Sequence, residues 1–497
     1  MAEPLGVVAA GHPLSAQAGA NALAEGGNAV DGAVAAMLTS FACEPLLTGL
    51  GAGGHMLVVE PGHAPVLLDF FVEAPGRGAD AGSVATLVPI SVSFGDADQV
   101  FNIGPASVGT YGVAAGVVSA SSRFGRIPLT DLVRPAAKLA REGVELNIPQ
   151  AYVIEILAGI VTSTPECAAL FAPGGRVVRA GDTLRQPELA DALERLGPEG
   201  AAPFYTGDLA AAIADWLEDR GGMVTAADLA AYEIVDRTPI RVSYRGRDVV
   251  TNPPPSAGGI LIAHALALLD AEPDAPDVTQ VVATMERTQA ERTPDFIEGL
   301  NDPEFVKRFL ARSSALGSTT HVAVLDREGW ACSVTCSNGS CSGVVVPGTG
   351  IHLNNMLGEQ DLNPLGFHRH PPGRRMPSMM SPTAVLGEGA PELVLGSAGS
   401  NRIRSAILQT IIRVIDDGLE AGDAVRAPRV HFEDGVVYVE PGIDTVALER
   451  EGSVISPFRE LNLFFGGVQA VARDRQGRFS GGGDPRRGGA AVLVSAE

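Results

Sequence analysis

The sequence predicts an α+β or layered α/β fold, and three observations predict it. The first part of the chain is rich in helical patterns, and the part after residue 319 is rich in alternating strand patterns. Its 60 glycines and 35 prolines mark many tight turns between short elements. A helix-rich part followed by a strand-rich part is typical of helices layered on sheets, and we find no repeat of fixed period.

Composition excludes several classes of protein. The 497 residues carry 58 acidic and 36 basic side chains, a net charge of −22, which argues against binding to nucleic acid or to anionic lipid. No run of 18 apolar residues predicts a transmembrane helix, and the first residues lack the basic and apolar regions of a signal peptide. We therefore expect a cytoplasmic protein, or a periplasmic or secreted one if a leader has been removed.

The first half predicts mainly helices. Leu14, Ala18 and Ala22 form a helical stripe that ends at 26–28, and an almost wholly apolar helix follows at about 29–40. Strands are predicted at 55–60 and 65–71, and amphipathic helices over 128–230, including one at 208–220. The pattern at 225–228 is a capping box that opens the next helix.

The second half predicts mainly strands. We expect a strand at 241–250, a rigid loop at 253–259 and a charged helical stretch at 285–316. Alternating residues on both sides of the turn at 327–329 predict a hairpin. Further strands are expected at 343–346, 384–386 and 393–395, and a helix at 401–418.

Two glycine-rich motifs have ordinary explanations. Gly49, Gly51 and Gly54 match G-x-G-x-x-G, but a dinucleotide site needs a strand before and a helix after, and here the order is reversed. We expect instead a loop that lets backbone pass close to a neighbour or ligand. Residues 339–343 resemble a nucleophile elbow with Cys341 in place of serine, but a strand, not a helix, is predicted to follow.

Neither cysteines nor histidines predict a metal site. Cys332, Cys336 and Cys341 lack zinc-like spacing and are better explained as small buried thiols. Five cysteines are an odd number and too few for a disulfide scaffold. The sequence at 368–370 stands alone in a Pro/Gly loop, so a solvated loop is favoured. We expect no metal and no organic cofactor.

The informative segment is 317–321, where small residues lead to a threonine at the mouth of a strand. Composition alone favours an ordinary loop-to-strand join. The alternative is self-cleavage, in which the Thr319 hydroxyl attacks the carbonyl of Ser318 and water hydrolyses the resulting ester. The freed α-amine of Thr319, with an ordinary pKa of about 7.7–8.0, can then act as base for its own hydroxyl.

From about residue 8 to the C-terminus the chain resembles the γ-glutamyltransferase family of N-terminal nucleophile hydrolases. The matching stretches are ordered along the chain: 12–15, 26–31, 48–57, 134–140, 253–259, 319–321, 353–355, 381–383, 396–400 and 484–489.

The resemblance implies a four-layer αββα sandwich made as one proenzyme. Cleavage between Ser318 and Thr319 would give a large segment (1–318) and a small one (319–497), intertwined in one structural domain. Thr319 would be the nucleophile, and Ser337 falls where the family has a threonine that contacts it. Gly399 and Ser400 fall on a Gly-Gly pair whose backbone N–H groups form the oxyanion hole.

The substrate-binding positions depart from the family pattern. Phe71 stands where an arginine clamps the donor carboxylate, and phenylalanine cannot make that charge-assisted fork. The family's Ser-Ser pair is Ser378-Met379, the acidic residue that binds the donor amine is Glu359, and a family asparagine is replaced by Gly339, beside Asn338. Either another arginine (Arg77, Arg374 or Arg402) supplies the clamp, or the donor is an amide without an amino-acid head, as in cephalosporin-acylase-like or oxamate-hydrolase-like relatives.

We therefore expect an enzyme that passes an acyl group from a γ-glutamyl or similar small-molecule amide to water or an amine through an acyl-enzyme. The alternatives are an acylase acting on a non-glutamyl amide, or a homologue that only binds a ligand. We expect no nucleic-acid or membrane partner. The oligomeric state, the natural donor and acceptor, and the balance of transfer and hydrolysis are left open.

Overall fold

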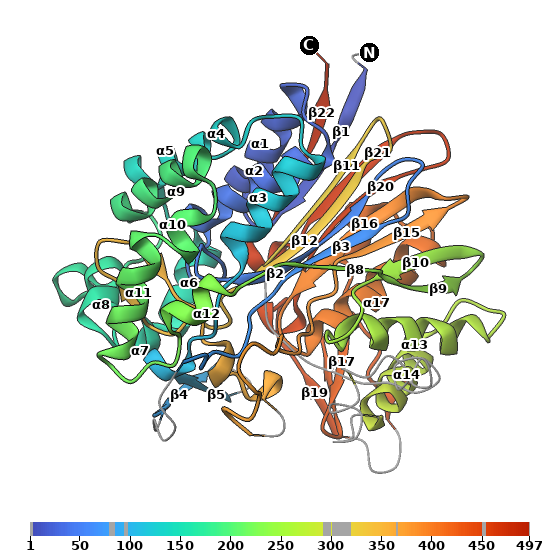
Figure 1. The fold of residues 1–497 in the computed structure, drawn as a ribbon. Coiled ribbons are helices and arrows are strands. Elements are labelled where there is room, and N and C mark those ends of the chain that lie inside the picture. Colours follow the sequence, from blue (N-terminus) through green and yellow to red (C-terminus); the bar gives the residue numbers. More distant parts are fainter. Residues whose placement is uncertain are drawn as a thin grey trace.

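The computed structural model describes residues 3–78, 85–93, 98–291, 300, 320–363, 366–449 and 454–496. Two antiparallel sheets face each other, and helices cover the outer side of each, which makes a four-layer αββα sandwich (Figure 1). The N- and C-terminal strands lie side by side at one edge (Figure 1). This arrangement confirms the predicted fold class.

The first sheet has seven strands. Their order is β22 (Ala490–Ser495), β1 (Pro4–Ala10), β11 (Thr320–Asp326), β12 (Ala331–Ser337), β2 (Gly53–Val59), β3 (Val66–Phe70) and β8 (Val235–Arg237). The hairpin predicted around 327–329 is confirmed, with Val322 opposite Val334. Every residue of β11 and β12 is buried, because helices lie on one side of these central strands and the second sheet lies on the other.

The second sheet has six strands, in the order β21 (Phe479–Gly483), β20 (Gly467–Arg473), β16 (Ala390–Ala398), β15 (Thr383–Gly387), β10 (Arg247–Thr251) and β9 (Ile240–Tyr244). The single strand predicted at 241–250 is wrong, because the chain makes a tight turn at Arg245 (φ 50°) and Gly246 (φ 74°). Two consecutive residues with positive φ suit the twist of a two-residue hairpin. Of the strand predicted at 343–346, only β13 (Val345–Val346) forms, since Gly343 has φ 71°.

Helices from the first half cover the outer face of the seven-stranded sheet. They are α1 (Pro13–Ala24), α2 (Ala29–Cys43), α3 (Val113–Phe124), α4 (Leu129–Leu132), α5 (Arg134–Glu142), α9 (Pro187–Glu199), α10 (Ala202–Tyr205), α11 (Asp208–Glu218) and α12 (Ala226–Ala230). Helix α2 is buried along its whole length, as its apolar sequence predicts. The capping box predicted at 225–228 is confirmed, since Thr225 and Asp228 cap each other reciprocally.

The outer face of the six-stranded sheet is covered by α13 (Gly258–Asp270), α14 (Val278–Ala290), α17 (Arg402–Ile415) and α18 (Ala421–Arg426). Most of the helical stretch predicted at 285–316 lies outside the described residues. A peripheral lobe holds α6 (Ile148–Ile156), α7 (Ala158–Val161), α8 (Pro165–Phe171), and the strand pairs β4 (Val88–Ser93)–β5 (Asp98–Ile103), β6 (Val144–Glu145)–β7 (Thr183–Leu184) and β13–β14 (Ile351–His352). A small sheet near α17 holds β17 (Val430–Glu433), β18 (Val436–Val439) and β19 (Val454–Pro457).

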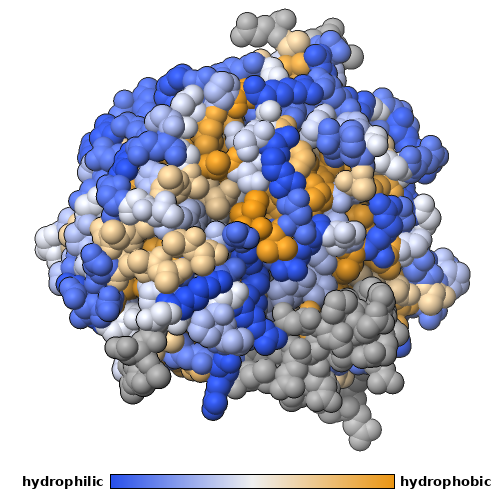
Figure 2. All heavy atoms as spheres, viewed as in Figure 1, coloured by the Kyte–Doolittle hydropathy of each residue, from blue (hydrophilic) through white to orange (hydrophobic). Residues whose placement is uncertain are grey.

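The core has three main layers. Aliphatic side chains of both sheets, such as Leu57, Leu325, Val250 and Val394, fill the space between the sheets. Larger clusters fill the space between each sheet and its helices. Hydrophilic residues cover much of the face in Figure 2, with apolar residues gathered in small patches, as the charge of −22 predicts for the surface. None of the helices in the described part of the chain is long and apolar enough to cross a membrane.

Gly49 and Gly51 lie in the loop between helix α2 and strand β2, and Gly54 lies near the start of β2, so the elements follow the predicted order. A Cβ atom at Gly51 would lie 2.5 Å from the carbonyl oxygen of His352. The glycine therefore lets a distant backbone segment approach closely, which confirms the explanation drawn from sequence.

Candidate functional site

The predicted cleavage point, Ser318 and Thr319, lies outside the described residues. The first described residue after it, Thr320, begins β11 in the middle of the seven-stranded sheet and pairs with Cys336 of β12. Thr320 is buried, and its hydroxyl donates to Glu44 Oε1 at 3.1 Å. The predicted cleavage point is therefore directly bonded to a buried residue at the start of a central strand.

Ser337 is the last residue of β12, one position beyond the partner of Thr320. Its side chain is fully buried, and its Oγ accepts a hydrogen bond from the backbone N–H of Gly339 at 2.8 Å. Gly339 has φ 68°, so the chain turns sharply directly after the strand. This turn holds the Ser337 hydroxyl at the end of β12.

Gly399 and Ser400 directly follow β16 in the facing sheet, where their φ angles of 116° and 58° both lie in the left-handed region. The two strands meet face to face, because a Cβ at Gly396 would lie 2.4 Å from the ring of His321. From that contact, β11 runs back to its start at Thr320 while β16 runs on towards Gly399. The start of β11, the end of β12 and the end of β16 thus converge at one end of the sandwich.

Glu44 is a buried carboxylate at this point that the sequence analysis missed. It follows α2, and a Cβ at Gly11 would lie 2.3 Å from its Oε1, so a glycine makes room for the carboxylate. Burial raises the pKa of Glu44 to about 7, although the Thr320 hydrogen bond and the charge of Arg487 act in the opposite direction. A carboxyl group with such a pKa changes its charge near neutral pH.

Phe71 lies close to Ser337. Gly53 of β2 pairs with Ser337, and a Cβ at Gly53 would lie 3.0 Å from the Phe71 ring. The ring stacks on His55 at a centroid distance of 5.4 Å, and it belongs to a buried cluster with Met356 and Met376. The position where the resemblance places an arginine is therefore apolar.

An arginine that sequence reasoning missed, Arg375, lies behind Phe71. Its guanidinium donates to the backbone carbonyls of Phe71 and Glu233 and lies 3.6 Å from Asp69 and 3.5 Å from Glu73. Burial by itself would raise the pKa of Asp69, but His55 and Arg375 outweigh burial and hold that pKa below its ordinary value. Arg375 therefore supports the backbone behind Phe71 through its two terminal nitrogens, while its buried Nε has no hydrogen-bond partner.

The structure brings Asn338, Gly339 and Glu359 together beside Ser337. Glu359 Oε1 accepts hydrogen bonds from the backbone N–H and the hydroxyl of Ser340, at 2.9 and 3.1 Å. A Cβ at Gly339 would lie 2.9 Å from Glu359 Oε1, so glycine is needed for this approach. Asn338 Nδ2 donates to the His352 carbonyl at 3.4 Å.

Ser378 and Met379 have other surroundings. Ser378 Oγ accepts from the Met380 backbone N–H at 2.9 Å. Met379 packs in the apolar core between the second sheet and its helices. The Met379 side chain is thus directed into a different core from the Phe71 cluster.

The three arginines considered as replacement clamps differ in their surroundings. Arg77 forms an ion pair with Glu73 at 3.0 Å. Arg374 is half-buried, and its backbone carbonyl accepts a hydrogen bond from the N–H of Ala74 at 2.9 Å. Arg402 lies two residues after Ser400, at the start of α17. Of the three, only Arg402 belongs to the segment that continues from Gly399 and Ser400.

The other candidate sites of the sequence have structural explanations. Strand β13, not a helix, follows residues 339–343, so no nucleophile elbow forms there. All five cysteines are free and buried, and burial raises the pKa of those at 43, 167, 332, 336 and 341 above the ordinary value. Within the described ranges, no group of three or more His, Cys, Asp or Glu side chains is placed to hold a metal ion.

Two facing antiparallel sheets between helical layers, with strand ends converging on the start of an internal strand, define the class of N-terminal nucleophile hydrolases. The family model for gamma-glutamyltranspeptidase matches residues 15–494. The chain therefore belongs to the γ-glutamyltranspeptidase family, whose members are enzymes.

The relatives fall into two named groups. The chain is 32% identical to an acylase ACY 1 proenzyme of Pseudomonas sp. (strain SE83), over 99% of this chain and 94% of that protein. It is also 32% identical to a glutathione hydrolase proenzyme of Escherichia coli (strain K12), over 97% and 90% of the two chains. Among solved structures, a cephalosporin acylase from Bacillus halodurans superposes with a TM-score of 0.83 and 26% identity, covering 100% of this chain and 97% of that one.

Proposed function

We propose that Thr319 is the nucleophile of a self-cleaving amidohydrolase or acyltransferase. The observation that carries the proposal is the convergence of Thr320, Ser337 and the Gly399–Ser400 turn, since Thr319 is covalently bonded to Thr320. A hydroxyl beside the nucleophile and backbone N–H groups at a left-handed turn are the groups that acyl transfer needs.

Self-cleavage would begin with attack of Thr319 Oγ on the Ser318 carbonyl carbon. The C–N bond breaks as the C–O ester forms, and the nitrogen takes up the hydroxyl proton. Water then hydrolyses the ester, giving a carboxylate at Ser318 and a free α-amine at Thr319. The chain would become a large segment, 1–318, and a small segment, 319–497, held together because both sheets contain strands of each.

Substrate turnover would repeat the same chemistry. The α-amine of Thr319 takes the proton of its own hydroxyl, and Oγ attacks the amide carbonyl of the donor. The N–H groups of Gly399 and Ser400 stabilise the negatively charged oxygen, and the amine leaves with a proton. Water or an amine then attacks the acyl-enzyme and releases the acyl group.

Two donor classes are consistent with membership of the family: γ-glutamyl amides and other acyl amides. The environment of Phe71 favours the second, because an apolar cluster offers no charge to a zwitterionic glutamyl head. We therefore infer an acylase-type amidohydrolase with reduced use of γ-glutamyl donors. Glu359 remains the candidate for contact with a donor amine, with Asn338 and Gly339 in the same group beside Ser337.

The test is mass spectrometry and denaturing electrophoresis of the purified chain. Wild type should give fragments of 318 and 179 residues, the smaller beginning with Thr319. Thr319→Ala should remain one chain, and Thr319→Ser, which keeps a hydroxyl, should be cut more slowly. Wild type that stays intact while hydrolysing amides would refute the proposal.

A further inference from the structure

The turn at Gly399 and Ser400 needs support from its surroundings. Ser400 is buried and has φ 58°, in the left-handed region where a side chain makes the backbone conformation costly. Such a conformation persists only where the neighbouring structure fixes it. Since the proposed oxyanion hole uses the N–H groups of these two residues, whatever fixes the turn also sets the direction of its donors.

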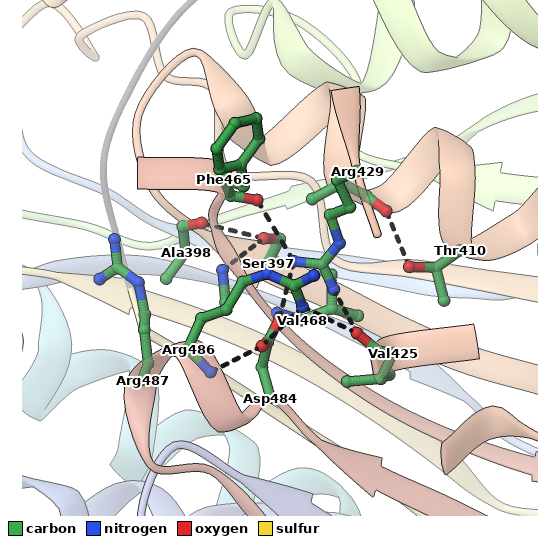
Figure 3. Close-up of polar contacts among 12 residues, drawn as sticks. Ser397, Ala398, Thr410, Val425, Arg429, Phe465, Val468, Asp484, Arg486 and Arg487 are labelled. Carbon is green, nitrogen blue, oxygen red and sulfur yellow. Dashed lines mark hydrogen bonds and ion pairs between the residues drawn. The ribbon is translucent and has the colours of Figure 1, made fainter. Parts of the chain in front are cut away.

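One flank of the turn is fixed from the start of strand β17. Arg429, the residue before β17, is buried and forms an ion pair with Asp484 at 2.7 Å (Figure 3). Its Nη1 also donates to the carbonyl of Phe465 at 3.2 Å. The next residue, Gly466, lies against the turn, because a Cβ at Gly399 would lie 2.7 Å from Gly466 Cα. Arg429 therefore holds the backbone on which Gly399 rests.

The other flank is fixed from the end of β17, by Glu433. Its Oε1 accepts a hydrogen bond from Nδ2 of Asn401, the buried residue that directly follows Ser400. The Asn401 Oδ1 atom has no hydrogen-bond partner, so within the described residues Glu433 provides the one hydrogen bond that holds this amide. Glu433 Oε2 also lies 3.9 Å from the guanidinium of Arg402, the next residue of the chain.

Glu433 is itself held in place by a neutral histidine. Burial lowers the pKa of His431 to about 4, so its ring carries one proton at neutral pH. A carboxylate can only accept, so Nε2 donates to Glu433 Oε2 at 3.2 Å and Nδ1 accepts from the hydroxyl of Ser405 at 2.8 Å. Burial would raise the pKa of Glu433, but His431 and then the charge of Arg402 outweigh burial and lower it to about 2. Glu433 is therefore a fixed negative charge.

The order Ser405, His431, Glu433 contains the groups of a hydrolytic triad, yet it is not a second active site. Ser405 is buried in helix α17, and the cavity beside it has a volume of about 10 Å³. That volume is the room of one water molecule at most, far too small for a substrate. The three side chains therefore join α17 to β17.

We propose that Glu433 is a positioning residue that, through Asn401, holds the Gly399–Ser400 turn with its two N–H groups directed at the reacting carbonyl oxygen. This inference rests on the proposed function and extends it from the donors of the oxyanion hole to the group that fixes them. Donors that are already in place stabilise the developing negative charge without having to reorganise. A turn released from Glu433 should therefore lower kcat and leave KM almost unchanged.

The test measures kcat and KM of the mature enzyme with γ-glutamyl p-nitroanilide and butanoyl p-nitroanilide, per mole of N-terminal Thr319 counted by mass spectrometry. On whichever anilide wild type hydrolyses faster, Glu433→Ala should lower kcat by about 10- to 100-fold and change KM by less than about twofold. Glu433→Gln keeps an oxygen that can accept from Asn401, so it should retain more activity than Glu433→Ala. Asp434→Asn removes the exposed carboxylate next along the chain and should leave kcat unchanged.

A double-mutant cycle tests whether Glu433 acts through Asn401. Asn401→Ala should lower kcat as Glu433→Ala does, and the double variant should lose no more than Glu433→Ala alone, because the two side chains act as one unit. Losses that multiply in the double variant overturn the inference. Wild-type kcat in both single variants also overturns it, as does a loss accompanied by an equal rise in KM, which a distorted site would produce.

Two further outcomes are also decisive. If Glu433→Ala does not fold, Asn401→Ala decides, because it leaves the contact between Glu433 and His431 in place. A wild-type chain that is never cut refutes the proposed function and this inference with it. A cut and active wild type whose variants keep full activity refutes the role of Glu433 alone.

Discussion

The buried carboxylate beside Thr320 makes the stability of the chain depend on pH in a direction that can be measured. Glu44 has an ordinary pKa of 4.5 in the unfolded chain and about 7 in the folded chain, with burial as the main cause. The folded state therefore binds this proton more tightly than the unfolded state between these pH values. The stability contributed by protonated Glu44 is complete below about pH 4.5 and is lost as the pH rises through 7.

The size of the effect follows from the difference between the two pKa values. At about 1.4 kcal/mol per pKa unit, Glu44 lowers the free energy of unfolding, relative to a group that cannot ionise, by about 3 kcal/mol at pH 8 and about 1 kcal/mol at pH 5. The glutamine of Glu44→Gln cannot ionise, but its side-chain oxygen can still accept the hydrogen bond from Thr320. For a chain of this length, about 3 kcal/mol corresponds to about 3 °C in Tm.

The assay is thermal unfolding at pH 5 and pH 8, in a Thr319→Ala background so that every sample is uncut and carries no new α-amine. Glu44→Gln should raise Tm by about 3 °C at pH 8 and by about 1 °C at pH 5. The other groups facing Glu44, namely Cys43, Thr320 and Arg487, are unchanged in both proteins. Glu218→Gln, on the exposed side of α11, is the control and should shift Tm equally at both pH values. A Glu44→Gln shift that is equal at both pH values, or negative at pH 8, refutes the reasoning.

Two further substitutions test the site and its support. Gly399 has φ 116°, and Gly399→Ala would place a Cβ 2.7 Å from Gly466 Cα, so the turn must move and kcat should fall by about 100-fold. The control is Gly435→Ala, at φ 82° in open space, which should leave kcat unchanged. A Gly399→Ala enzyme with wild-type kcat would exclude a catalytic role for this turn. Asp69→Asn removes the buried carboxylate that pairs with Arg237 at 2.6 Å and with Arg375 at 3.6 Å, and it should lower the free energy of unfolding by about 3–5 kcal/mol in urea titrations. An unchanged urea midpoint would mean that the cluster behind Phe71 contributes little to stability.

Local patterns were sufficient to predict many elements. The apolar sequence of 29–40, the capping box at 225–228 and the hairpin around 327–329 each depend on interactions among residues close in sequence, and each is confirmed. The strand predicted at 241–250 is wrong because an Arg-Gly turn divides it. The residues on both sides of that turn are strand formers, so their periodicity alone could not reveal it.

The candidate site could be predicted only in part. A run of small residues before a threonine predicts a nucleophile, and the resemblance to a family adds roles for Ser337, Gly399 and Ser400, which remain predictions. Glu44 and Arg487 carry no such signal. Each is a single charged residue in its local segment, and only burial and distant partners give it an unusual pKa.

The amino-acid sequence by itself predicted helices layered on sheets, because local periodicity distinguishes helices from strands. The motifs ordered along the chain predicted the family and, through the resemblance, the αββα sandwich. Tertiary structure decided which charges meet. It brought Glu44 to Thr320 across 276 positions, and it brought the charge of Arg487 close enough to Glu44 to act on the pKa of that carboxyl. The physical reason is that electrostatic effects depend on distance and burial, which no local pattern in the chain specifies.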